Sequence, residues 1–271
     1  MGARRAPPRD SSAIWPSTCW PRGGRPSVVT ASNTEILVAV IARLLEGARH
    51  VAVGAASPIP GSAALLARRL SGGRMRVSVL GSRANNFFTD GGRELFDCAA
   101  QGRIDAFFLG GGQIDGQGNI NLVGVGAYPT MDVRWSGSFG SAYLYFLVPR
   151  VILFREEHTV RTLVDKVDFV SAPGVSAPNV YRPGGPHALV TSRCLFAFDK
   201  AKRRFRLAST HPGSSAEDVR ANTGFAYDTP ESVPETEAPA SEWLALLRGP
   251  VRDEIAETYP SFAATAFGRA A

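Results

Sequence analysis

The sequence predicts an α/β fold: an open, mostly parallel sheet flanked by helices, with an antiparallel hairpin appended to it. Three observations carry this prediction. Short apolar runs of strand length alternate with helical patterns over the first 110 residues, and turn-forming residues separate them. Later, two β-like runs flank a charged turn, which is typical of a hairpin.

The first half of the chain supplies the alternating elements. Asn33 and Thr34 can cap a helix over 35–46, where apolar residues recur at i, i+3, i+4 and i+7, and Gly47 is suited to end it. A βαβ rhythm follows. Its expected members are a strand at 50–54, a helix at 63–70, a strand at 76–80, a helix after Asp90 with Leu95 and Phe96 inward, and a strand at 106–109.

The second half is expected to complete the sheet and to end in a helix. The stretch 188–207, two runs around the charged turn 199–204, predicts the appended hairpin. Further strands are expected at 143–147, 151–154, 167–170, 188–191, 195–198 and 205–208, a short helix at 215–220 capped by Ser214 or Ser215, a surface linker at 228–240 and a last helix at 241–247.

Composition excludes several classes. Residues 1–32 are rich in Pro, Arg, Ser and Gly without periodicity, so we expect a disordered extension or a start placed too far upstream, and a single domain over 33–271.

Residues 1–30 hold five arginines against one aspartate, a net +4 of the total +6, so the remainder has no nucleic-acid footprint. Three cysteines without a CxxC pair predict no metal site. No apolar run is long enough for a membrane span, and we expect a cytoplasmic protein.

The most informative stretch is 108–121, where a strand runs into Gly110, Gly111 and Gly112 and then into polar residues alternating with apolar ones. Consecutive glycines let backbone N–H groups approach a phosphate or a developing oxyanion. Neither common phosphate-binding motif matches. The alternative is a tight turn at a strand end followed by a hairpin around 115–118, and the residues alone leave both open.

The run GGGQIDGQGNIN at 110–121 resembles the GGAQID-xx-GNIN segment of family I CoA-transferase β subunits such as glutaconate CoA-transferase. The similarity extends to 54–70, to 190–199 and to HPGSSAEDV at 211–219, so it covers roughly 33–230, and in character the chain is similar to the steroid ring-opening CoA-thioester hydrolase branch. This implies a homologous α subunit, in a heterodimer or heterotetramer, an interface active site and acyl-CoA as substrate, with coenzyme A the only cofactor-like group.

The resemblance also implies a glutamate nucleophile just after a central strand. That position falls at the end of 76–80, where the chain continues with Gly81 and Ser82 and offers no carboxylate. Asp90 and Glu94 lie several residues further on, and Ser82 lacks a recognisable base, so it is expected to be a turn or cap residue. Hydrolysis or ring opening of a carboxylated or alicyclic acyl-CoA, with a catalytic acid from the α subunit, is therefore favoured; transfer between carboxylic acids and a non-catalytic partner role are the alternatives.

The remaining candidates are substrate-binding residues. Gln113 could donate its amide to the thioester oxygen with help from the Gly111 and Gly112 N–H groups. Further candidates for substrate or turn contacts are Asp115, Asn119, Asn121, Arg83, Asn85 and Asn86, with the glycine- and serine-rich loop 134–140 as a possible acyl-pocket wall. His158 is the most site-like histidine, although a solvated polar turn is the favoured interpretation there, and Glu156 and Glu157 are expected to be surface charge.

Overall fold

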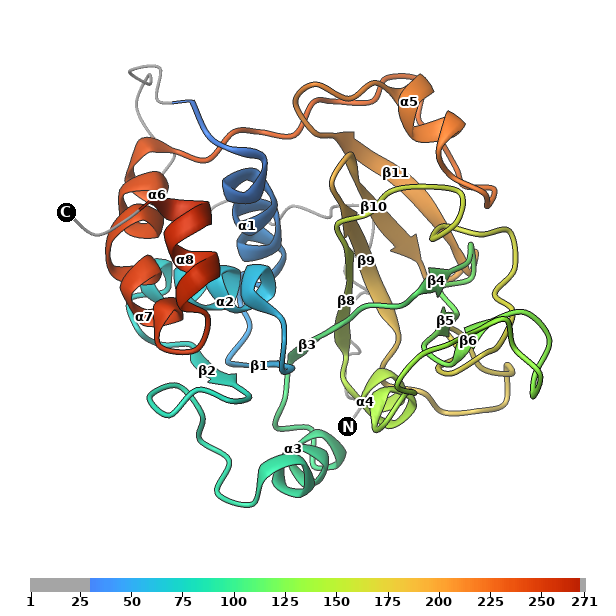
Figure 1. Cartoon of the computed structure of the whole chain (residues 1–271), viewed down its shortest axis with the longest axis horizontal. Coiled ribbons are helices and arrows are strands. Elements are labelled where there is room, and N and C mark those ends of the chain that lie inside the picture. Colours follow the sequence, from blue (N-terminus) through green and yellow to red (C-terminus); the bar gives the residue numbers. More distant parts are fainter. Residues whose placement is uncertain (1–29, 269–271) are drawn as a thin grey trace, which may run out of the picture.

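A seven-stranded sheet forms the centre of the protein (Figure 1), whose structure is a computed structural model that describes residues 30–268. The strand order is β11-β10-β9-β8-β3-β1-β2. All neighbours from β2 to β9 are parallel, whereas β10 is antiparallel to both β9 and β11. The predicted fold class is confirmed. The strands are β1 (His50–Val53), β2 (Arg76–Val79), β3 (Ala106–Leu109), β8 (Arg150–Arg155), β9 (Pro186–Thr191), β10 (Cys194–Asp199) and β11 (Arg204–Thr210).

Helices from both ends of the chain cover one face of the sheet (Figure 1). The central strands are buried on both faces: Val51 and Val53 of β1 face this helical layer, and Ala52 between them faces the opposite core. The layer therefore joins segments that are far apart in sequence. Its members are α1 (Asn33–Leu44), α2 (Pro58–Leu70), α6 (Ser241–Leu246), the kinked segment η1 (Leu247–Val251), α7 (Arg252–Ala256) and α8 (Pro260–Phe267).

The other face carries a second core formed by shorter elements. Tyr145 is fully buried there and donates from its hydroxyl to the Gly118 carbonyl at 2.8 Å, which fixes one helix against a ribbon. The elements are α3 (Gly91–Ala100), α4 (Ser141–Leu147), α5 (Ala216–Ala221), and two ribbons, β4 (Gln113–Ile114) with β5 (Ile120–Asn121) and β6 (Gly124–Val125) with β7 (Val133–Arg134).

Two helix starts differ from the sequence prediction. Ser32, not Asn33 or Thr34, is the N-cap of α1, because its hydroxyl accepts from the Glu35 N–H while the Glu35 carboxylate accepts from the Ser32 N–H. Helix α2 begins at Pro58 rather than at residue 63, since proline is well accommodated in a first turn. Residues 30–32 thus lead into the fold, and the rest of the expected extension, 1–29, lies outside the described residues.

Two expected strands are absent from the described structure. Residues 143–147 form most of α4, because a helix buries Leu144 and Tyr145 on one side and leaves Tyr143 half exposed. Residues 167–170 form no strand. Ala172, which follows shortly after them, accepts a backbone hydrogen bond from Ile120 instead. The expected 188–207 hairpin is part of the main sheet, and the helix expected at 241–247 is followed by α7 and α8, which were not predicted.

Candidate active site

Loops from β1, β2 and β3 meet at the carboxyl edge of the sheet. The three strands are parallel, so the segments 54–57, 80–85 and 110–112 leave the sheet on the same side. Strand β1 lies between the other two, which sets the ends of β2 and β3 about 10 Å apart at the usual strand spacing. The predicted site residues fall into two groups, one after β2 and one after β3.

The loop after β2 contains a carboxylate that comes from elsewhere in the chain. Ser82 is buried and donates from Oγ to Glu257 Oε2 at 2.6 Å, and the Arg83 N–H donates to Glu257 Oε1 at 2.8 Å. Ser82 Oγ also accepts from the Asn85 N–H at 2.9 Å. The Ser82 hydrogen bond, followed by the Arg83 N–H, lowers the pKa of Glu257, so this carboxylate is ionised at neutral pH.

The segment that carries Glu257 lies across the ends of two strands. The Tyr259 hydroxyl accepts from the Ser57 N–H at 3.3 Å in the loop after β1. A Cβ on Gly81, which has φ of +92°, would lie 3.8 Å from Thr258. The sequence did not predict Glu257 as a site residue. It follows the last predicted helix and lies 175 positions from Ser82, so no local pattern connects the two residues. The acids that local reasoning considered do not return to the strand end: Glu94 accepts from the N–H groups of Thr89 and Asp90 at the start of α3.

Asn85 and Arg83 occupy opposite environments in the same loop. Asn85 is buried and accepts from Arg68 Nη1 at 2.9 Å, while its carbonyl accepts from the Val79 N–H at 2.7 Å. Arg68 in turn pairs with Glu254 of α7. The Arg83 side chain is exposed. Asn85 therefore holds the loop to α2, and Arg83 is the member of this group that is free to meet a ligand.

The three glycines after β3 are closely packed, and two of them leave no room for a side chain. A Cβ on Gly110 would lie 3.0 Å from the Phe154 carbonyl, one on Gly111 would lie 2.6 Å from Ile120, and one on Gly112 would lie 2.1 Å from Trp135. Real Cβ atoms do not approach other heavy atoms under 3.0 Å, so the last two positions exclude any side chain without rearrangement. The β4–β5 hairpin that follows confirms the turn interpretation of this stretch. A ligand-binding role of the glycine N–H groups stays a prediction.

Gln113 belongs to a polar cluster in which Gln113 and Asn121 are buried and Asp168 is exposed. Its Oε1 accepts from Asn121 Nδ2 at 2.8 Å and from the Asp168 N–H at 3.0 Å, and its Nε2 donates to Asp168 Oδ2 at 3.1 Å. Asp168 Oδ2 also accepts from the Gly126 N–H. The side chain of Gln113 therefore joins the β4–β5 ribbon to Asp168, and Asp168 extends the contact to Gly126 next to β6. Whether it also donates to a thioester oxygen stays a prediction.

Asp115 and Asn119 hold the tip of the β4–β5 hairpin. Asp115 Oδ1 accepts from the N–H groups of Gln117 and Asn119, and its Oδ2 accepts from Asn119 Nδ2. Asn119 Oδ1 accepts from the Gly174 N–H at 3.0 Å. These contacts are the backbone-satisfying role that was one of the two interpretations of these residues.

The loop 134–140 forms an aromatic surface next to the glycines. Trp135 lies directly over Gly112, and Phe139 packs on Phe96 with ring centroids 5.8 Å apart while remaining 93% exposed. Tyr143 contacts the other side of Phe96 at 5.7 Å. An exposed aromatic group of this kind is suited to cover an apolar acyl chain or a partner chain.

His158 is buried, which corrects the expectation of a solvated turn. Its Nδ1 lies 2.7 Å from Thr191 Oγ1 and its Nε2 lies 2.9 Å from Thr223 Oγ1, and burial lowers its pKa to about 4. Cys194 Sγ lies 3.9 Å from His158 Nδ1, but burial raises the pKa of the thiol strongly. A neutral imidazole beside a protonated thiol holds β8, β9 and α5 together and is not an activated nucleophile. Glu156 and Glu157 lie at the surface side of this turn, where two arginines lower the pKa of Glu157 to about 2.

Within the described residues, the site offers hydrogen-bonding groups and the carboxylates of Glu257, Asp115 and Asp168, of which Glu257 lies at the end of β2, but no metal-binding cluster of His, Cys, Asp or Glu. None of the helices between residues 30 and 268 is long and apolar enough to cross a membrane.

Comparison with known proteins agrees with this geometry. The family model described as Coenzyme A transferase matches residues 29–222. The chain is 37% identical over 154 residues to the β-type subunit of 3-oxoadipate CoA-transferase from Pseudomonas knackmussii, and 36% identical over 148 residues to the β-type subunit of glutaconate CoA-transferase from Acidaminococcus fermentans. These matches cover 54% and 52% of this chain but only 58% and 54% of the two relatives.

A third relative has a different activity in its name. The cholesterol ring-cleaving hydrolase IpdB of Rhodococcus jostii, also a single subunit, is 32% identical over 160 residues, which cover 58% of this chain and 62% of that protein. The crystal structure of IpdAB matches with a TM-score of 0.72 over 82% of this chain and 94% of that one, at 26% identity. The crystal structure of the glutaconate enzyme matches with the same TM-score over 89% of this chain and 99% of that one, also at 26% identity.

Proposed function

The chain belongs to the coenzyme A transferase family, and on that premise we propose that it is the β-type subunit of a heteromeric enzyme that acts on acyl-CoA thioesters. The reaction we propose is hydrolysis or ring opening of a carboxylated or alicyclic acyl-CoA. A homologous α-type subunit would complete the site at the carboxyl edge of the sheet. Both transferase relatives are named as one subunit of a larger enzyme, which supports this division into two chains.

One observation carries the choice of reaction: the loop after β2 contains no carboxylate of its own. Transfer of CoA between two acids through a covalent enzyme intermediate requires a carboxylate that forms an acyl anhydride and then holds CoA as a thioester while the first acid leaves, whereas hydrolysis requires only a polarised carbonyl and an activated water. The segment 80–85 supplies Ser82, Arg83 and Asn85 but no acid. The name of the ring-cleaving hydrolase relative points in the same direction.

Glu257 does not replace a nucleophile in this proposal. Both of its oxygens accept hydrogen bonds from the loop, and the lowered pKa makes it a weaker nucleophile and a weaker base. Its place is to hold the Ser82–Arg83 turn in position. The catalytic acid or base would come from the α-type subunit, while this chain contributes the Arg83 side chain and the Trp135 and Phe139 surface for the carboxylated and apolar parts of the acyl group.

Transfer of CoA between carboxylic acids is the second candidate. The relatives at 36% and 37% identity carry CoA-transferase names, and Glu257 places one carboxylate beside the end of β2. If the Ser82 contact opened when substrate binds, this carboxylate would be available for attack on the thioester carbonyl.

Product analysis separates the two reactions. The complex co-expressed with its α-type partner would be incubated with dicarboxylic and alicyclic acyl-CoAs in ¹⁸O-labelled water, with and without acetate, and the products identified by mass spectrometry. Label in the acid product without acetyl-CoA, or a ring-opened CoA product, is the expected result. Acetyl-CoA that forms only with acetate would establish transfer instead, and loss of that activity in Glu257→Gln would identify the carboxylate responsible.

A non-catalytic role for this chain is tested in the same assay. Arg83→Ala and Phe139→Ser, both on the exposed surface of the proposed site, should reduce turnover in a complex that still assembles. Unchanged kinetics in both variants would mean that the chemistry lies wholly in the α-type chain.

A further inference from the structure

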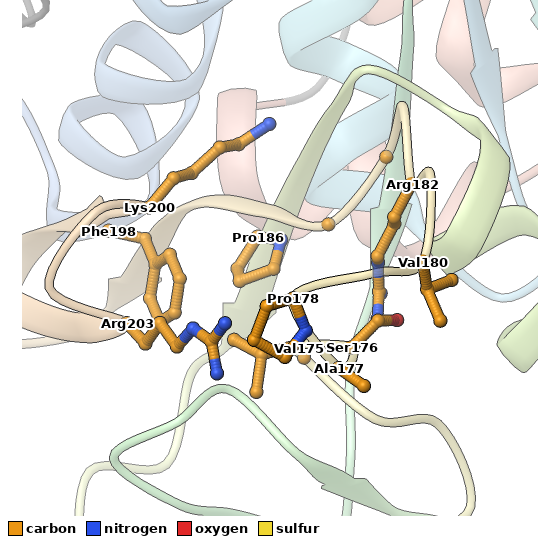
Figure 2. Close-up of a pocket in the computed structure, with 13 residues that line it drawn as sticks. Val175, Ser176, Ala177, Pro178, Val180, Arg182, Pro186, Phe198, Lys200 and Arg203 are labelled. Atoms are coloured by element: carbon orange, nitrogen blue, oxygen red, sulfur yellow. The ribbon is translucent and has the colours of Figure 1, made fainter.

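A pocket of about 200 Å³ lies at the opposite edge of the sheet from the proposed active site. Figure 2 shows the side chains that line it. Pro186 at the start of β9 lines it, together with the turn between β10 and β11 and the loop 174–185. Strands β8 and β9 run parallel to β1, β2 and β3, so their first residues lie at the amino edge. The pocket is therefore separated from the carboxyl edge by the length of the strands.

The charge of this pocket is of one sign. Arg182, Lys200 and Arg203 line it, and among residues 30–268 no aspartate or glutamate does so. The carboxylate of the neighbouring Asp199 stabilises the β10–β11 turn, because it accepts from the N–H groups of Ala201 and Lys202. The three cations therefore face a hollow without a carboxylate lining it.

Arg182 is held rigidly at one side of the pocket. Its Nη2 donates to the Tyr145 carbonyl at 3.1 Å, its Nη1 donates to Ser176 Oγ at 3.3 Å, and its guanidinium lies over the Tyr145 and Phe146 rings at 5.1 and 5.6 Å. Its Nε is buried without a hydrogen-bond partner among the described residues. A guanidinium has five N–H donors, so these contacts leave donors for an anion while fixing the group in place.

The other two cations come from the β10–β11 turn. The Arg203 side chain is exposed, and its guanidinium points toward Pro178 and Pro186 across the pocket (Figure 2). Lys200 donates only a long hydrogen bond of 3.4 Å to the Pro149 carbonyl, and burial, with repulsion from Arg182, lowers its pKa. An anion in the pocket would relieve this repulsion.

We propose that this pocket binds a small molecule through a phosphate group with two or more negative charges. Two guanidinium groups on opposite walls suit the several oxygens of a phosphate or pyrophosphate, because each can donate two parallel hydrogen bonds. Phe198 and Val175 in the lining would contact an organic part of the ligand. The proposal is independent of the reaction at the carboxyl edge and goes beyond it.

Calorimetric titration of the co-expressed complex tests the site with two probes, inorganic pyrophosphate and adenosine 3′,5′-bisphosphate, at low ionic strength. Saturable binding at one site per β-type chain is the expected result. Tighter binding of the bisphosphate would identify a nucleotide phosphate as the ligand, and equal or tighter binding of pyrophosphate a free phosphate. Arg203→Ala and Lys200→Met should each weaken binding about tenfold or more, since each removes one charge from the ligand shell.

Lys202→Ala is the matched control, because Lys202 lies on the same turn but pairs with Asp228 at 3.3 Å and does not line the pocket. It should leave the affinity within about twofold. Absence of saturable binding, or an equal loss in all three variants, would overturn the proposal. If Arg203→Ala and Lys200→Met released the α-type chain while the parent complex bound no phosphate, the cations would serve a contact between the two chains instead. Turnover of acyl-CoA, measured on the same samples, keeps this outcome separate from the proposed reaction.

Discussion

The loops after β2 and β3 reach the same edge of the sheet but are built in different ways. The loop after β3 is closed by its own neighbours, since Gly112 packs under Trp135 and Gln113 bonds to Asn121 eight positions on. The loop after β2 depends on Glu257, which lies 175 positions away in the segment between α7 and α8. One half of the site is therefore encoded locally, and the other exists only when the C-terminal helices are docked.

The largest expected effect of breaking the local half comes from Gly112→Ala. The new methyl group would lie 2.1 Å from the Trp135 ring, so either the ring or the hairpin must move, and overpacking of this kind costs about 3 kcal/mol of unfolding free energy. Chemical denaturation measures the loss. Gly54→Ala after β1 is the control, because its Cβ would find ordinary contacts at 3.8 Å, and it should cost less than about 1 kcal/mol. Equal losses in the two variants would mean that the Trp135 contact is not what excludes a side chain.

Gln113→Ala is expected to rank next, at about 2 kcal/mol. It leaves one N–H of the buried Asn121 amide without its acceptor, and a buried donor that loses its acceptor bears the desolvation cost, whereas the N–H of the exposed Asp168 can bond to water. Denaturation of the complex and its turnover should be measured together. A stability loss with unchanged turnover would assign Gln113 to the scaffold alone, whereas a fall in kcat in the folded complex would support its donation to the thioester oxygen.

Glu257→Gln weakens the long-range contact with the loop after β2 and should lower the free energy of unfolding by about 1 kcal/mol. The amide keeps the shape but removes the charge and one of the two acceptor oxygens, so it cannot accept from both Ser82 Oγ and the Arg83 N–H, and solvent exposure keeps the loss small. Glu231→Gln, an exposed position in the 228–240 segment, should leave stability unchanged. Faster hydrogen exchange at Arg83 in the first variant only would localise the effect.

The pH dependence of that difference has a defined sign. The pKa of Glu257 is lowered in the folded protein from an ordinary value of 4.5, so its contribution is fully present above pH 4.5. It is lost as the pH falls through the folded-state pKa, because the carboxylate is then protonated in both states. The stability gap between the parent protein and Glu257→Gln should therefore close below pH 4.5, and a gap that widened there would contradict the assigned hydrogen bonds.

The same contrast explains what the sequence could predict. The strands at 50–54, 76–80 and 106–109 and the hairpin around 115–118 depend on residues within a few positions of each other, and those predictions are confirmed. Residues 143–147 were expected to be a strand, but in the structure they form a helix that buries Tyr145 against Gly118. Glu257 carries no local signal at all: only the docking of α7 on α2, through Glu254 and Arg68, brings it to Ser82.

Arg83→Ala is expected to change the stability of the loop after β2 very little, so it tests the function of the side chain alone. The loop uses the Arg83 backbone N–H, which any residue but proline supplies, and the side chain is exposed, so stability should change by less than about 0.5 kcal/mol. If the guanidinium meets the carboxylate of the acyl group, KM for a dicarboxylic acyl-CoA should rise about tenfold or more while KM for an uncharged acyl-CoA stays the same. An equal rise for both substrates would place Arg83 against the CoA part, and unchanged KM for both would remove it from the site, leaving the long-range half of this edge with a purely structural function.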